Sequence, residues 1–177
     1  SSAPDLKDFA SRAWLTDLLK PEHIATKRYF GETAFRNGDM VRFVNKKVSQ
    51  FDKEEKLALE RAIKALSAEA GLSRQAEVEE VETDLIVLGK EDLGYELGCS
   101  DCHAFHFEDD DADGPDLTGY GSREWMKSFI SDPGQKRFYG ENNDRMPSFL
   151  TEGILTPTEI GLLVDWLRQD WYEPLPK

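Results

Sequence analysis

The chain has 177 residues, a formal net charge of −13 and a mean hydropathy of −0.59, which suits one or two small globular domains. It contains no apolar run of the roughly 18 residues that a membrane-spanning helix needs. The acidic balance disfavours nucleic acid as a partner. It suits either docking to a basic face of another protein or solubility alone.

The first part of the chain, residues 1–72, is predicted to end in an amphipathic helix. Asp52 and Glu55 have the spacing of a capping box at its start, and Gly71 is placed to end it. The apolar positions recur at helical spacing: Leu59, Ile63 and Leu66. This helix must therefore pack one face against the rest of the protein.

Residues 73–83 are strongly acidic and lack a convincing period, which indicates a linker or a solvated helix. A helix is predicted over residues 84–97, because Leu85, Leu88 and Leu93 are spaced there as on one face of a helix. Ser122 is expected to cap a short helix that carries Trp125. Since no segment has a convincing strand pattern, we predict an all-α fold.

The last predicted helix has the clearest start signal in the chain. Thr156 stands at the N-cap, Pro157 at the first helical position and Glu159 at the third, which is a capping box with a well-placed proline. Apolar residues follow at helical spacing: Ile160, Leu163, Val164 and Leu167. One face of this helix is expected to be buried.

An internal repeat relates the two ends of the chain. Residues 3–14 realign on residues 114–125 with Pro, Asp, Leu, Ser, Arg and Trp in register, and residues 27–32 match residues 136–141. Met40 likewise corresponds to Met146. The period of roughly a hundred residues indicates duplication of a domain-sized unit. We therefore divide the chain into a partial unit (1–72), an acidic linker (73–83) and a second unit (84–177).

The motif Cys99-Ser-Asp-Cys102-His103 lies only in the second unit. C-x-x-C-H is the attachment pattern of c-type haem, in which two thiols add to the haem vinyl groups and the histidine ligates the iron. A redox dithiol, half of a zinc site and a disulfide are the alternatives. A structural zinc site needs about four Cys or His ligands, and few are available here. The motif therefore predicts one covalent haem c.

The second unit resembles the class I cytochrome c family from Leu85 to about Tyr172. The matching features are Cys99–His103, the Gly-Pro-Asp-Leu-Thr-Gly run at residues 114–119, the Arg-Met-Pro run at residues 145–147 and the terminal amphipathic helix. The sequence of residues 122–125 and 137–147 is also similar to that of cytochrome c domains attached to bacterial cytochrome bc-type complexes. The resemblance implies a helical cytochrome c-like fold around one haem, preceded by a related unit without a haem motif.

This resemblance also implies the axial ligands. His103 is the expected proximal ligand, and Pro115 is expected to offer its carbonyl to the other ring nitrogen of the histidine. Met146 is the expected distal ligand, because a thioether suits ferrous iron and His/Met ligation raises the reduction potential. Met126 fits core packing better. His106 is the competitor, although a surface role suits it better.

Three further residues are assigned to the haem surroundings. Arg123 matches a family arginine near the haem propionates, and Trp125 would pack on the haem or donate its indole N–H to a propionate. Tyr120 would line the pocket wall. Ordinary core or helix-surface roles are the alternatives for all three residues.

Asp109–Gly114 has the D-x-D-x-D-G beginning of an EF-hand calcium loop. Position twelve of that loop is Tyr120, where a bidentate glutamate is required. A solvated acidic loop is therefore the favoured interpretation, with a calcium site as the alternative.

Together these features predict an electron carrier, not an enzyme, as a subunit or domain of a respiratory chain of the cytochrome bc type. Haem attachment to this motif implies a periplasmic or otherwise extracytoplasmic location. The expected partners are redox proteins with a basic docking face, including a membrane cytochrome complex, while the chain itself has no membrane span. A haem peroxidase-related domain and a haem-based redox or gas sensor are the alternative functions.

Overall fold

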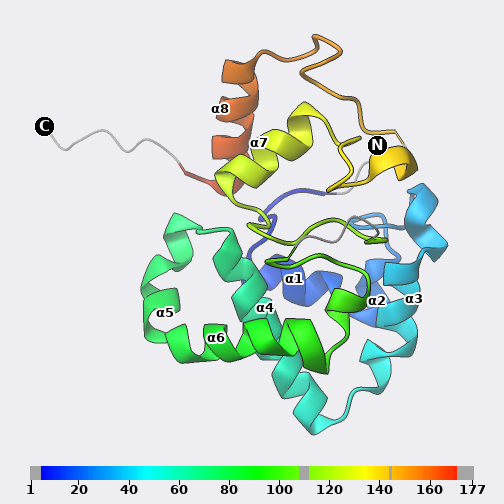
Figure 1. Ribbon diagram of the computed structural model, residues 1–177, viewed down its shortest axis with the longest axis vertical. Helices are drawn as coiled ribbons and strands as arrows, with labels where there is room; N and C mark the ends of the chain where they lie inside the picture. Colours follow the sequence, from blue (N-terminus) through cyan, green and yellow to red (C-terminus); the bar gives the residue numbers. More distant parts are fainter. Residues whose placement is uncertain (1–4, 108–111, 144, 171–177) are drawn as a thin grey trace, which may run out of the picture.

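The computed structural model describes residues 5–107, 112–143 and 145–170. In these ranges the chain forms helices and loops without a strand, which confirms the predicted all-α class (Figure 1). The α-helices are α1 (Arg12–Leu18), α2 (Pro21–Ile24), α3 (Asp39–Lys46), α4 (Lys53–Glu69), α5 (Ala76–Val81), α6 (Thr83–Glu91), α7 (Arg123–Ser131) and α8 (Pro157–Arg168). Within the described ranges, every helix is too short or too polar to cross a membrane.

Helix starts follow the local signals in the sequence. The Asp52 and Thr156 side chains each accept a backbone N–H at the third helical position, and Glu55 and Glu159 reach back to the respective caps. Both predicted capping boxes are confirmed. Ser122 caps α7 by accepting from the backbone N–H of Trp125. Such caps stabilise a helix end because they satisfy amides that have no partner within the helix.

The two units of the internal repeat contain equivalent hydrogen bonds. The indole N–H of Trp14 donates to the carbonyl of Asp5 at 3.3 Å, and that of Trp125 donates to the carbonyl of Asp116 at 3.0 Å. In each unit the tryptophan therefore pins the loop that precedes its helix.

The two units meet where equivalent residues face each other. Ala10 and Gly121 hold the same place in the repeat, and a Cβ on Gly121 would lie only 2.2 Å from the Cβ of Ala10. The rings of their neighbours, Phe9 and Tyr120, lie 5.2 Å apart. Gly121 also has a φ of +72°, so a side chain there would be strained as well as crowded. The contact between the two units is therefore formed by residues that are equivalent in the repeat.

Helix α6 packs against α4 of the first unit, and α8 packs against α7 (Figure 1). Gly89 permits this close α4–α6 crossing, because a Cβ there would lie 2.1 Å from the carbonyl oxygen of Arg61. The segment at 73–83 contains α5 and a short 3₁₀ turn, Ser73–Gln75. One continuous core includes side chains of both units.

The helix expected over residues 84–97 changes geometry before its end. After α6 the chain forms a π-helical turn, Asp92–Glu96, in which the Leu97 N–H donates to the Asp92 carbonyl at 3.1 Å. The Asp92 carboxylate is buried and accepts from Arg61 Nε at 2.7 Å and from Arg61 Nη2 at 3.0 Å. This bidentate pair ties the segment before the C-x-x-C-H motif to α4.

Replacing Asp92 with alanine is expected to lower the free energy of unfolding by about 2 kcal/mol, because Arg61 loses a bidentate charged partner. Urea denaturation would measure this change. Glu124→Ala removes an exposed carboxylate that pairs with Lys127, and it should change stability by less than about 0.5 kcal/mol. Equal losses in the two variants would contradict a special role for the Arg61–Asp92 pair.

Candidate functional site: the C-x-x-C-H segment

The motif lies on a tight turn directly after the π-helical turn. Gly98 enters it with a φ of +73°, a left-handed conformation that favours glycine. Cys99–Asp101 form a 3₁₀ turn, and the backbone N–H of His103 donates to the Cys99 carbonyl at 3.0 Å. Cys99 and Cys102 are half-buried and are not joined in a disulfide. The turn therefore brings two thiols and one imidazole together on one short segment.

The His103 ring is held by the loop of the second unit. Its Nδ1 lies 2.7 Å from the carbonyl oxygen of Pro115. Since a carbonyl can only accept, Nδ1 carries the proton and Nε2 keeps a free lone pair. Gly114 packs against the ring, where a Cβ would lie 2.5 Å from Cε1. The imidazole is thus fixed in orientation and in the tautomer that a metal ligand requires.

Burial lowers the pKa of His103, although the hydrogen bond to Pro115 acts in the opposite direction. A lowered pKa keeps the imidazole neutral at neutral pH, and only the neutral ring can ligate a metal. The neutral state and the fixed orientation of the His103 ring therefore favour its binding to a metal.

The two thiols lack the properties of a redox-active dithiol. Burial raises the pKa of Cys99 to about 11, with Lys47 opposing the shift. Burial also raises the pKa of Cys102, as do the nearby carboxylates of Asp113, Asp101 and Asp39. Reactive cysteines instead have lowered pKa values in electropositive surroundings. The structure therefore disfavours the thioredoxin-like alternative.

The His106 ring contacts Glu69 and does not join the cysteines of the motif in a metal site. Its Nε2 lies 2.9 Å from Oε1 of Glu69, and its side chain is about half exposed. No group of three or more His, Cys, Asp or Glu side chains suited to hold a metal ion occurs among the described residues. A structural zinc site needs about four ligands, so this arrangement disfavours the zinc alternative.

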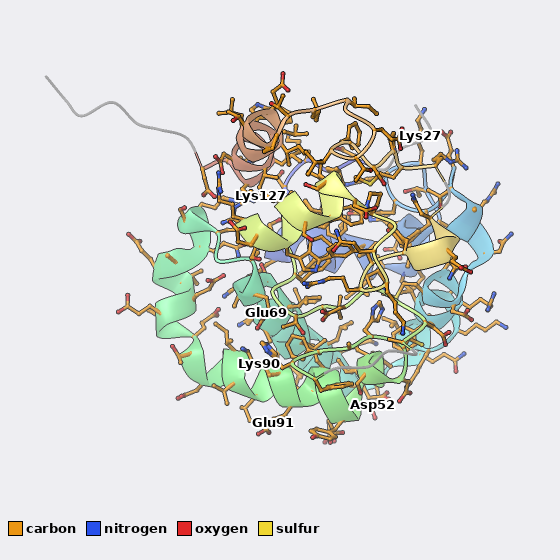
Figure 2. All side chains as sticks on the ribbon, turned by 45° about the horizontal axis from the view of Figure 1, so that its top comes forward. Lys27, Asp52, Glu69, Lys90, Glu91 and Lys127 are labelled. Atoms are coloured by element: carbon orange, nitrogen blue, oxygen red, sulfur yellow. The ribbon has the colours of Figure 1, made fainter. Side chains whose placement is uncertain are left out.

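Glu69 connects the first unit to both sides of the C-x-x-C-H motif. This nearly buried carboxylate on α4 accepts from Lys90 Nζ at 2.9 Å, from His106, and from the backbone N–H of Gly119 at 2.9 Å. Figure 2 shows Glu69 and Lys90 next to each other on α4 and α6. A single side chain thereby links α4, α6 and the loop after His103.

Glu69 should make stability depend on pH. Burial raises its pKa, but the hydrogen bonds from Lys90, His106 and Gly119 outweigh burial, and the pKa falls below its ordinary value of 4.5. A lowered folded-state pKa contributes stability above pH 4.5, and this contribution is lost as the pH falls through the folded value. Urea midpoints between pH 7 and pH 3 should therefore fall less steeply in Glu69→Gln than in the wild type. Parallel curves would contradict this assignment.

The aromatic residues assigned to the haem surroundings lie in one cluster. Trp125 stacks on Phe129 at 5.2 Å and meets Tyr120 at 5.1 Å and Phe138 edge-on at 5.0 Å. Tyr120 and Trp125 are buried, in keeping with a wall or core position. The indole N–H of Trp125 is engaged by the carbonyl of Asp116, so packing suits this residue better than donation to a propionate.

Arg123 lies at the start of α7 and pairs with α8. Its Nε and Nη2 donate to the Asp165 carboxylate at 2.6 and 3.0 Å. The guanidinium is therefore already satisfied by a carboxylate of the protein. Its expected role near a haem propionate stays a prediction.

Met146 lies in an irregular segment between a 3₁₀ turn (Gly140–Asn142) and α8. It is partly buried against the core, and Asn143 Nδ2 donates to its backbone carbonyl at 2.8 Å. Met126 is buried within α7, as its predicted core role requires. Met40 is the second residue of α3 and is also partly buried. Of these three methionines, only Met146 lies on a loop.

Sequence reasoning missed the residues of the first unit that hold the motif segment. Lys47 Nζ donates to the carbonyl of Leu97 at 3.1 Å, Arg61 pairs with Asp92, and Glu69 receives Lys90. Each contact joins positions far apart in the chain. No local pattern marks these residues, and only the tertiary structure brings them together.

A groove of about 590 Å³ lies beside the motif. Tyr95 and Phe107 are strongly exposed there, at 87% and 49%. The complete lining is Lys90, Glu91, Gly94, Tyr95, Ser100, Phe105, His106 and Phe107. Exposed aromatic side chains at such a place suit contact with another protein.

No family model, curated protein or solved structure matches this chain. The carboxylates at residues 109–111, for which a solvated acidic loop is the favoured interpretation and a calcium site the alternative, lie outside the described residues. Functional assignment therefore rests on the motif and on the geometry around it.

Proposed function

We propose that the protein is an electron carrier with one haem c attached through Cys99 and Cys102. The observation that carries this proposal is the His103 imidazole, held by Pro115 with its Nε2 lone pair free and its pKa lowered. Two unpaired thiols share the same turn. This combination supports haem attachment over the zinc and dithiol alternatives.

The residues fit the group that the motif implies. Each thiol adds across one vinyl group, so that a carbon–sulfur bond forms, the vinyl double bond is consumed and the thiol proton passes to carbon. His103 would supply the proximal nitrogen, and Met146 would supply the distal thioether. When bound, haem supplies one-electron exchange between its ferric and ferrous states. With both ligands supplied by the protein, the iron would exchange electrons and would not bind a substrate.

The surroundings suggest the kind of partner. The acidic charge of the chain favours a donor or acceptor with a basic face, and the groove at Tyr95 and Phe107 offers an apolar contact next to the motif. Interfaces that support electron exchange are often small and weak. We assign the protein to an extracytoplasmic respiratory chain, beside a membrane cytochrome complex of the bc type.

Ligand binding to the purified haem protein tests this function. We expect reversible one-electron reduction, a weak sulfur-to-iron charge-transfer band in the ferric form, and no ready binding of carbon monoxide by the ferrous form at neutral pH. Ready carbon monoxide binding would instead indicate an open distal site. That result would favour a peroxidase-related or sensor domain.

A further inference from the structure

The outer face of α8, formed by Leu162 and Trp166, is exposed although both side chains are large and apolar. Their exposed fractions are 64% and 60%. The opposite face of α8 packs towards α7 and buries Ile160 and Val164. Figure 1 shows α8 at the periphery, beside α7 and far from α6. An adjacent leucine–tryptophan pair of this kind is typical of an interaction surface.

The internal repeat identifies the equivalent face of α4. Ala10 and Gly121 are repeat equivalents, and each carbonyl accepts from the terminal helix of its own unit. Ser67 Oγ donates to Ala10 at 2.8 Å, and Arg168 Nη1 donates to Gly121 at 2.7 Å. Pairing Ser67 with Arg168 also aligns the apolar stripes of the two helices, Leu59, Ile63 and Leu66 on α4 with Ile160, Val164 and Leu167 on α8.

Counting back from these two residues gives the register of the helices. Arg61 corresponds to Leu162, because each lies six residues earlier, and Ala65 corresponds to Trp166, two residues earlier. The outer face of α8 therefore matches the Arg61–Ala65 face of α4.

In the first unit this face is covered by a helix. Gly89 of α6 crosses α4 there, and a Cβ on Gly89 would lie 2.1 Å from the Arg61 carbonyl oxygen and 3.0 Å from the Ala65 Cβ. Ala65 is completely buried as a result. This face is thus covered by α6 on α4, whereas on α8 no described helix covers the equivalent face.

We propose that the outer face of α8 binds an amphipathic helix of a partner protein. The partner helix takes the place on α8 that α6 takes on α4, and it covers Leu162 and Trp166 with apolar residues spaced three and four apart. Helix-in-groove recognition works in this way, because successive turns of one helix present a continuous apolar stripe. This surface is separate from the haem motif, so the proposal does not depend on electron transfer.

Selection from a displayed library of peptides of about 18 residues, roughly five helical turns, tests the proposal on the full haem-loaded chain. We expect enriched sequences to carry an amphipathic helical pattern. Calorimetric titration of one enriched peptide should then show affinity at least about tenfold weaker for Leu162→Glu and for Trp166→Glu, because each variant removes buried apolar area. Leu57→Glu, at an exposed position on α4, is the matched control and should leave the affinity unchanged.

Three results would overturn the proposal. One is the failure of the library to enrich any helical pattern. Another is binding that is insensitive to both α8 substitutions while the variants keep their helicity and haem absorbance. The third is a dimer, detected by light scattering, that the α8 substitutions abolish, since the occupant would then be a second copy of this chain.

Discussion

Replacing both Cys99 and Cys102 with serine is expected to abolish covalent haem attachment. The hydroxyl of serine does not replace a thiol in forming the carbon–sulfur bonds, so haem should separate from the chain in denaturant. Haem staining after a denaturing gel and the absorbance of the alkaline pyridine complex would measure the loss. This is the largest effect that we expect from any substitution in the chain.

Single substitutions sharpen this prediction. Cys99→Ser and Cys102→Ser should each keep one thioether and shift the absorbance of the alkaline pyridine complex relative to the wild type. Ser100→Ala, between the two cysteines, is the control and should retain full haem content. Covalent haem in the double variant would show that the motif is not the attachment site.

Met146→Ala is expected to lower the reduction potential by about 0.1–0.3 V, within the roughly 0.8 V range over which axial ligands set haem potentials. In the proposed function the Met146 thioether would stabilise the ferrous state, and its loss would open the distal position. The sulfur-to-iron charge-transfer band should vanish, and the ferrous form should now bind carbon monoxide. Potentiometric titration followed by absorbance would measure both changes.

The other methionines provide matched controls. Met126 is buried within α7, so Met126→Leu should leave the potential and the charge-transfer band intact. Met40→Leu tests the first unit, whose Met40 is also partly buried. If Met40→Leu removed the band and Met146→Ala did not, the distal ligand would come from the first unit.

Local chemistry explains which features the sequence predicted. The caps at Asp52, Ser122 and Thr156 depend on side chains within three residues of the amides that they satisfy. The contact between Pro115 and His103 spans only 12 residues, and the resemblance to class I cytochromes c implies it. The π-helical turn after α6 was missed, because its carboxylate, Asp92, is paired with a residue of another helix.

The sequence by itself determined the helical class, the capped helix starts, the repeat and the likeness of its second unit to a haem-binding domain. All of these follow from neighbouring residues, whose spacing decides which side chains share a helix face or a turn. Only the tertiary structure decided that α6 lies on α4, that Glu69 and Arg61 hold the motif segment, and that α8 leaves Leu162 and Trp166 uncovered. The apolar stripe of a helix requires a partner but does not specify which one, because the choice depends on close approaches such as that of Gly89 to Arg61.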